Sequence, residues 1–218
     1  SDDLRALAVL FRFKVDGAQP LRNRAVFDVV GRHPEQLDEI DEDLARKILA
    51  VDAQPIAREN SPWIDWALGE LGQVERNGSS RGTSNPRICE YLDAVQDKLG
   101  DRGDTTPWCG AFVAWVLKQH NKERPNEPQT IPPNPEGARN WCKWVRQSPP
   151  AVGATLPQPG DVAVVKVEKG HHVGFVFEVD TSTGSFWMLG GNQTGGTRVS
   201  LSKWSLDALA TDANDGAA

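Results

Sequence analysis

The chain has 218 residues, of which 39% are hydrophobic, and a formal net charge of −6 with a pI near 5.3. This is enough chain and apolar content for one globular domain of about 150 residues with an appendage. The acidic balance argues against nucleic acid as the main ligand, because phosphate binding needs a basic surface. No membrane span is expected, since no stretch approaches roughly 20 apolar residues. No signal peptide is visible either, because Arg12 and Lys14 interrupt the apolar run near residue 1.

Residues 1–57 differ in composition from the rest of the chain. They contain no Trp and no Cys, and they carry a dense acidic run at residues 38–43. Apolar and polar residues alternate over residues 9–15, which predicts a strand, with a short helix as the alternative. Apolar residues at helical spacing after Pro34 predict a helix whose acidic face is solvated or binds a partner. We therefore expect a small N-terminal α/β or helical unit of unassigned role over residues 1–57, and a second domain over residues 58–218.

The first half of the second domain reads as helices joined by loops rich in Gly, Ser and Pro. Helices are expected from residue 61, from residue 86, from about residue 107 and over residues 137–145. The prolines between residues 121 and 136 exclude regular structure there, and long loops of this kind often line functional sites. Most of the eight tryptophans are expected to be packing residues, Trp66 and Trp115 in particular.

The second half changes to the alternating pattern that is typical of strands. Alternation is found over residues 161–167, 172–179, 185–189 and 197–201. Helices followed by strands indicate an α+β domain in which the helices pack on an antiparallel sheet.

Cys109 lies where a reactive cysteine would be placed. Thr105 or Thr106 can act as N-cap and Pro107 suits the first helical position, so Cys109 falls in the first turn of an apolar helix. The partial positive charge of a helix N-terminus favours the thiolate, which is the nucleophilic form of cysteine. The alternative is a small hydrophobic side chain that fills the core.

The other two cysteines, Cys89 and Cys142, do not suggest a metal or a disulfide framework. Three scattered cysteines are too few for a disulfide scaffold, and none has zinc-ligand spacing to another. We therefore expect neither a metal nor a cofactor. Whether Cys89 and Cys142 pair cannot be decided from their spacing alone.

A histidine and a carboxamide follow Cys109 in chain order. His172 is the candidate base, because one imidazole can both take the thiol proton and protonate a leaving amine. In the predicted strand His172, Gly174 and Val176 share one face, and the opposite face carries two phenylalanines. If the phenylalanine face packs on the helices, His172 points away from that core; with the faces reversed, His171 takes its place.

Asn192 is the candidate for the third side chain, which would orient the imidazole, and Gln193 beside it is the second choice. Both could also be ordinary turn residues after Gly190 and Gly191. Trp108, His171 and Gln193 are candidate substrate-binding residues around this centre.

Four segments together resemble the NlpC/CHAP superfamily of papain-like cell-wall hydrolases. They are residues 108–117, 159–164, 172–175 and 189–193, and the likeness extends upstream to about residue 60. The resemblance implies a papain-like α+β fold, cleavage of amide bonds in peptidoglycan, Cys109 as nucleophile, His172 as base and Asn192 as orienter. NlpC members commonly have Asp before the cysteine and Ser after it, whereas Trp108 and Gly110 stand here. The pattern is nearer to CHAP proteins, and both endopeptidase and N-acetylmuramoyl-L-alanine amidase activity stay open.

The resemblance also implies a setting. The expected partner is the peptidoglycan stem peptide, and an effector would in addition meet an immunity or delivery protein. A phage lysin, a wall-remodelling enzyme and an antibacterial effector would share this domain, so we expect a protein that is secreted or delivered to the bacterial periplasm or cell wall. Two alternatives remain: a cysteine deamidase or protease toxin that acts on proteins, and a cell-wall-binding module without turnover.

Overall fold

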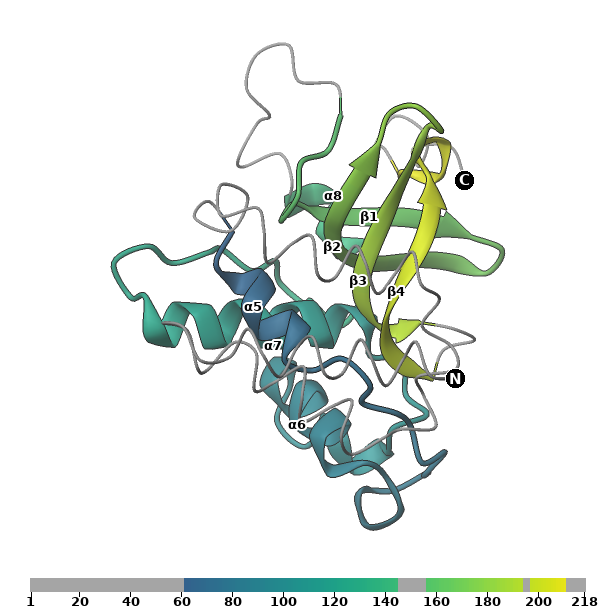
Figure 1. Cartoon of the computed structure of the whole chain (residues 1–218). Coiled ribbons are helices and arrows are strands. Elements are labelled where there is room, and N and C mark those ends of the chain that lie inside the picture. Colours follow the sequence, from purple (N-terminus) through teal and green to yellow (C-terminus); the bar gives the residue numbers. More distant parts are fainter. Residues whose placement is uncertain (1–60, 145–155, 194–196, 211–218) are drawn as a thin grey trace, which may run out of the picture.

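The computed structural model describes residues 61–144, 156–193 and 197–210, so the predicted unit over residues 1–57 lies outside the described residues. The helices are α5 (Trp63–Leu68), α6 (Pro86–Val95), α7 (Cys109–Glu123) and α8 (Asn140–Trp144), with short 3-10 turns at Arg81–Thr83, Leu99–Arg102 and Leu206–Ala208. The strands are β1 (Val162–Val167), β2 (Gly170–Asp180), β3 (Ser185–Gln193) and β4 (Arg198–Ser205). The expected α+β class is confirmed (Figure 1).

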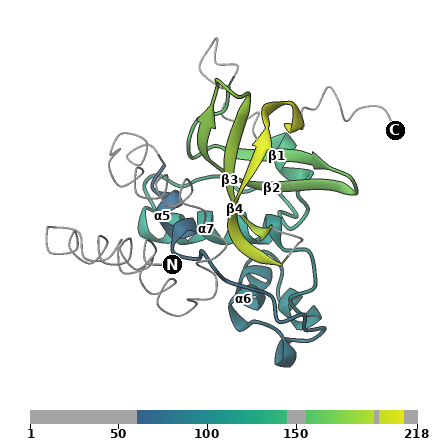
Figure 2. The same ribbon diagram turned by 45° about the vertical axis from the view of Figure 1, so that its right-hand side comes forward.

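The four strands form one antiparallel sheet in the order β1-β2-β3-β4. The sheet twists so strongly that β1 and β2 run across β3 and β4 (Figure 2). It also curls toward closure, because the chain after β4 returns to β1: Leu209 bridges Val165, and the Ala210 N–H donates to the Val164 carbonyl over 2.8 Å. At the other edge, residues 72–75 run beside the start of β4. The sheet therefore has one face toward the helices and one enclosed second face.

The helix-facing face carries the main core. Val173, Phe175 and Phe177 of β2 are buried in the same cluster as the apolar side chains of α5, α6 and α7. The second face carries a smaller cluster made of Ala163, Val165, Val176, Phe186 and Met188. The phenylalanine face of β2 thus packs on the helices, which is the arrangement in which His172 points away from the helical core.

The central helix of the domain is α7, and its residues from Cys109 to Leu117 are all buried. Trp115 is buried against the edges of Trp66 and Tyr91, so its predicted packing role is confirmed. Trp66 is partly buried and packs on the same core. Among the described helices, none has the length and apolar content that a membrane crossing requires.

Helix boundaries differ from the sequence prediction at one important place. The sequence predicts that Thr105 or Thr106 caps α7 and that Pro107 begins it, but the helix begins at Cys109 and its N-cap is Trp108, which gives no side-chain cap. The prediction for α6 is confirmed, since Asn85 caps the helix by accepting from the Arg87 N–H over 2.9 Å and Pro86 is its first residue. Caps that involve only local contacts are readable from sequence, whereas the start of α7 depends on contacts with distant segments.

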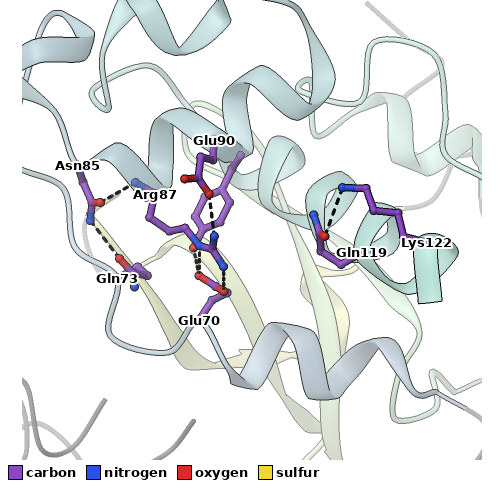
Figure 3. Close-up of polar contacts among 8 residues, drawn as sticks. Glu70, Gln73, Asn85, Arg87, Glu90, Gln119 and Lys122 are labelled. Carbon is purple, nitrogen blue, oxygen red and sulfur yellow. Dashed lines mark hydrogen bonds and ion pairs between the residues drawn. The ribbon is translucent and has the colours of Figure 1, made fainter. Parts of the chain in front are cut away.

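A buried ion pair connects α6 to the segment after α5 (Figure 3). Glu70 is 6% exposed and accepts hydrogen bonds from Arg87 Nε over 2.8 Å and from Tyr91 Oη over 2.6 Å. The Arg87 guanidinium lies 4.5 Å from the ring centre of Trp115 in α7. The same guanidinium also pairs with the exposed Glu90 over 2.7 Å. One arginine thus joins three helical segments of the core.

Candidate active site

The loop that leads into α7 is held by a buried carboxylate. Asp104 is fully buried and accepts hydrogen bonds from the main-chain N–H groups of Arg76, Gly78 and Asn85, each over 2.7 Å. Charge-assisted hydrogen bonds of this kind are stronger than neutral ones. They fix the chain five residues before Cys109, so the helix start is positioned by tertiary contacts and not by a side-chain cap.

Trp108 is not a surface residue. It is fully buried, it packs on Tyr91 and Phe112, and its indole N–H donates to Glu75 over 2.7 Å. A Cβ added to Gly191 at the end of β3 would lie 2.3 Å from the Trp108 ring. The indole thus fills the space between α7 and β3, and the expected contact of Trp108 with substrate stays a prediction that this burial does not support.

Cys109 is the first residue of α7 and is 6% exposed. Burial raises the pKa of its thiol, while the main-chain N–H groups of Val173, Gly110 and Cys109 itself lower that pKa in part. The sequence prediction that the helix N-terminus makes the thiolate the favoured form is thus wrong in its net effect. The helix N–H groups act in the expected direction, but desolvation of the buried sulfur outweighs them.

The contact with Val173 places the sulfur against the main chain of β2. Val173 directly follows His172, so the sheet brings the thiol within one residue of the predicted base. Cys109 and Val173, 64 positions apart in the chain, meet here because α7 packs on β2 and β3.

The proline-rich loop also reaches the start of α7. A Cβ on Gly110 would lie 2.1 Å from the Pro135 carbonyl oxygen, so only glycine allows this approach. The loop is tied down by Trp141, whose indole N–H donates to the Pro135 carbonyl over 2.7 Å, and by Asn121, whose side chain bonds the main chain of Gln129 in both directions. The proline-rich loop therefore lies beside the start of α7.

The two histidines lie on opposite faces of β2. His172 pairs across the strands with Val165 and stacks on Trp204, with ring centres 6.0 Å apart and an angle of 19° between the rings, so it belongs to the second face. It is 8% exposed, and burial lowers its pKa to about 4. His171 is half-buried and shares its face with Val173, toward the helices. The structure gives His172 no hydrogen-bond partner at Nε2.

The end of β3 places the two carboxamides differently. Asn192 lies in a bulge between β3 and β4, has a positive φ of 60° and is half-buried. Gln193 is 3% exposed, and its amide nitrogen donates to the carbonyls of Met188 over 3.0 Å and Ser200 over 2.8 Å. The amide of Gln193 is therefore bound to the sheet itself, which does not fit the expected role as a substrate contact.

Trp204 is a residue of this region that the sequence pattern does not single out. The alternation predicts the last strand only to residue 201, whereas β4 continues to Ser205. The sequence signal is weak, because Trp204 stands three residues after Leu201 and so breaks the apolar alternation of the strand.

The described part of the chain contains no group of three or more His, Cys, Asp or Glu side chains that could hold a metal ion. None of the three cysteines, all of which lie in the described part of the chain, forms a disulfide bond, so Cys89 and Cys142 are not joined to each other. What the arrangement offers is a buried thiol, an adjacent strand with an imidazole on each face, and a carboxamide pair one strand away. These are the groups that cysteine hydrolases use.

The comparison with protein families agrees with this chemistry. The family model described as CHAP domain matches residues 101–192, a segment that begins in the 3-10 turn before α7 and ends at Asn192 in β3. No curated protein and no solved structure matches the chain.

Proposed function

Because residues 101–192 match the CHAP domain, and CHAP domains are typically hydrolases that act on peptidoglycan, we propose that this protein cleaves an amide bond of peptidoglycan with Cys109 as nucleophile and His172 as base. The observation that supports the proposal best is the contact between the Cys109 thiol and the main chain of Val173, which joins the helix start to the residue after His172. The substrate is then a stem peptide, and the protein acts where peptidoglycan is found, in the bacterial periplasm or cell wall.

The chemical step starts from a neutral pair. Burial keeps a proton on the Cys109 thiol and keeps the His172 imidazole unprotonated at neutral pH. As the sulfur attacks the amide carbon, the imidazole accepts the thiol proton; it then gives this proton to the amine nitrogen when the C–N bond breaks. Water attacks the resulting thioester, which returns the free thiol and releases the carboxylate. The main-chain N–H of Cys109 is the first candidate donor to the oxyanion.

Purified sacculi incubated with the full chain and with Cys109→Ala test the proposal. We expect the wild type to release muropeptides that mass spectrometry identifies, and the variant to lose activity by about 100-fold or more. The mass of the new ends also tells an endopeptidase from an N-acetylmuramoyl-L-alanine amidase. Equal release by both proteins would reject the thiol mechanism, and no release by the wild type would favour a protein substrate or a binding module.

The choice between the two histidines needs its own comparison. His172→Ala should abolish release while His171→Ala retains it, since His172 is the buried histidine of the pair and His171 is only half-buried. The reverse result would assign the base to His171, which shares the helix-facing side of β2.

A further inference from the structure

We propose that Gln193, and not Asn192, is the positioning residue of His172, and that it acts on the second face of the sheet in a space that Trp204 closes. This inference rests on the proposed function in one respect, namely that His172 is the base. It concerns which side chain holds the imidazole, a point on which the sequence favours Asn192.

The first observation is that the Gln193 carboxamide lies on the same face as His172. Gly190 shares its face of β3 with Met188, which belongs to the second cluster. A Cβ added to Gly190 would lie 3.0 Å from Gln193 Nε2 and 3.4 Å from the Cα of Gly174. Gly174 is two residues along β2 from His172, so both point to one face. The two glycines thus leave space for the carboxamide on the face of the sheet that carries His172.

The second observation concerns unpaired atoms. The amide nitrogen of Gln193 is held by the carbonyls of Met188 and Ser200, which fixes the orientation of the carboxamide. Its Oε1 is buried without a hydrogen-bond partner, and so is Nε2 of His172. Buried polar atoms are nearly always paired in folded proteins, so two unpaired atoms on one face need an explanation. An imidazole N–H at Nε2 and the Gln193 oxygen complement each other, and one water molecule between them would satisfy both.

Trp204 closes the same space. Its ring is nearly parallel to the imidazole, with 6.0 Å between ring centres, and its Nε1 is also buried without a partner. A flat ring against the imidazole limits its rotation and excludes bulk water from Nε2. In the proposed reaction, Nδ1 would then be the ring nitrogen that accepts the thiol proton.

Asn192 is the less suitable candidate. It lies in a bulge, with its main chain in the left-handed region and its side chain half-buried. The turn chemistry of Asn accounts for its presence, because Asn tolerates a positive φ better than most residues.

A pair of isosteric substitutions tests the inference in the full chain. Gln193→Glu and Asn192→Asp each replace one amide by a carboxylate, and NMR titration of the His172 imidazole measures the effect. No charged neighbour contributes to the lowered pKa of His172 in the structure, since burial is its one cause, so a new charge nearby has a clear signature. We expect Gln193→Glu to raise the proton affinity of His172 by about tenfold or more, and Asn192→Asp by less than about threefold.

Turnover provides the second readout. Gln193→Met should lower kcat by about 100-fold with a smaller change in KM, because the base is no longer held in place. Gln193→Glu should retain more activity than Gln193→Met, whereas a purely structural role predicts the opposite, since a carboxylate would face two carbonyl oxygens. Asn192→Gly, which preserves the positive φ, should stay within about threefold of the wild type.

The titration needs no substrate, so the inference and the proposed function fail separately. A wild type that leaves sacculi intact rejects the function, whatever the titration shows. An unchanged proton affinity in Gln193→Glu, an equal or larger change in Asn192→Asp, or loss of turnover in Asn192→Gly alone would overturn the role of Gln193. Should Gln193→Met fail to fold, the pair of carboxylate variants decides.

Discussion

Burial dominates the chemistry of the two residues proposed to react. A buried thiol and a buried imidazole both favour their neutral forms, so the pair begins uncharged and not as a thiolate–imidazolium pair. The base must be neutral to accept a proton, and the pKa of His172 is about 4 in the folded protein. We expect kcat/KM on soluble muropeptides to fall only as the pH drops through about 4. A fall centred near 6.5, the ordinary pKa of histidine, would contradict this environment of His172.

The same burial makes the stability of the fold depend on pH. The pKa of His172 is about 4 when folded, against 6.5 when unfolded, so the unfolded chain binds the extra proton first as the pH falls. Stability is therefore lost progressively below pH 6.5, down to about pH 4. His172→Phe keeps a ring against Trp204 and removes the titration. Between pH 7 and 4.5, urea unfolding should show the wild type losing about 2 kcal/mol more than this variant. Equal losses would place His172 in water.

At the scale of elements, the start of α7 depends on one carboxylate. Asp104→Asn would replace a charged acceptor of three main-chain N–H groups by an amide that also carries donors. We expect a loss of about 3 kcal/mol in the free energy of unfolding, measured with urea. Asp101→Asn is the matched control, because Asp101 is exposed and pairs only at the surface with Arg81; its loss should be about 1 kcal/mol or less. Similar losses in the two variants would mean that the anchor does not stabilise the loop.

The contact between β3 and α7 allows a second prediction at this scale. Gly191→Ala would bring a Cβ to within 2.3 Å of the Trp108 ring, which cannot move because it is enclosed by Tyr91 and Phe112. The end of β3 should shift away from the helix start, and muropeptide release should fall by about tenfold or more. Gly82→Ala has open space around its Cβ and should behave as the wild type. An active Gly191→Ala protein would show that the position of this strand end is unimportant.

How far the sequence could predict these elements depends on the range of the forces involved. The helix that carries Cys109 and the alternating strands are set by local periodicity, and the structure has them within a few residues. The burial of Trp108 and the position of Cys109 against β2 involve residues 33 to 83 positions away in the chain. A pattern of neighbouring residues does not show which distant segments will be in contact. The choice between Asn192 and Gln193 therefore needed the fold, although both residues were visible as candidates.

For the molecule as a whole, the family match is shorter than the packed unit. The match begins at residue 101, but Ile64 of α5 and Ile88 of α6 are buried in the same cluster as Cys109 and Val173. Residues 72–75 extend the sheet beside β4. The candidate site is thus supported from both sides by segments that the family match does not include. We expect substitutions in those segments to lower the free energy of unfolding more than they lower kcat.

The Glu70–Arg87 pair is the clearest such support. Arg87 has two acidic partners, which can be compared directly. Arg87 bonds the buried Glu70 and the exposed Glu90, so the arginine stays the same whichever acid is changed. Glu70→Gln would leave the guanidinium partly buried against Trp115 without its main counter-charge and would weaken the bond from Tyr91. We expect Glu70→Gln to lower the free energy of unfolding by about 3 kcal/mol and Glu90→Gln by about 0.5 kcal/mol, both from urea titrations. The Glu70→Gln protein that remains folded should keep its kcat, since Glu70 contacts neither Cys109 nor His172. Equal destabilisation by the two variants would show that the burial of Glu70 does not strengthen its pair.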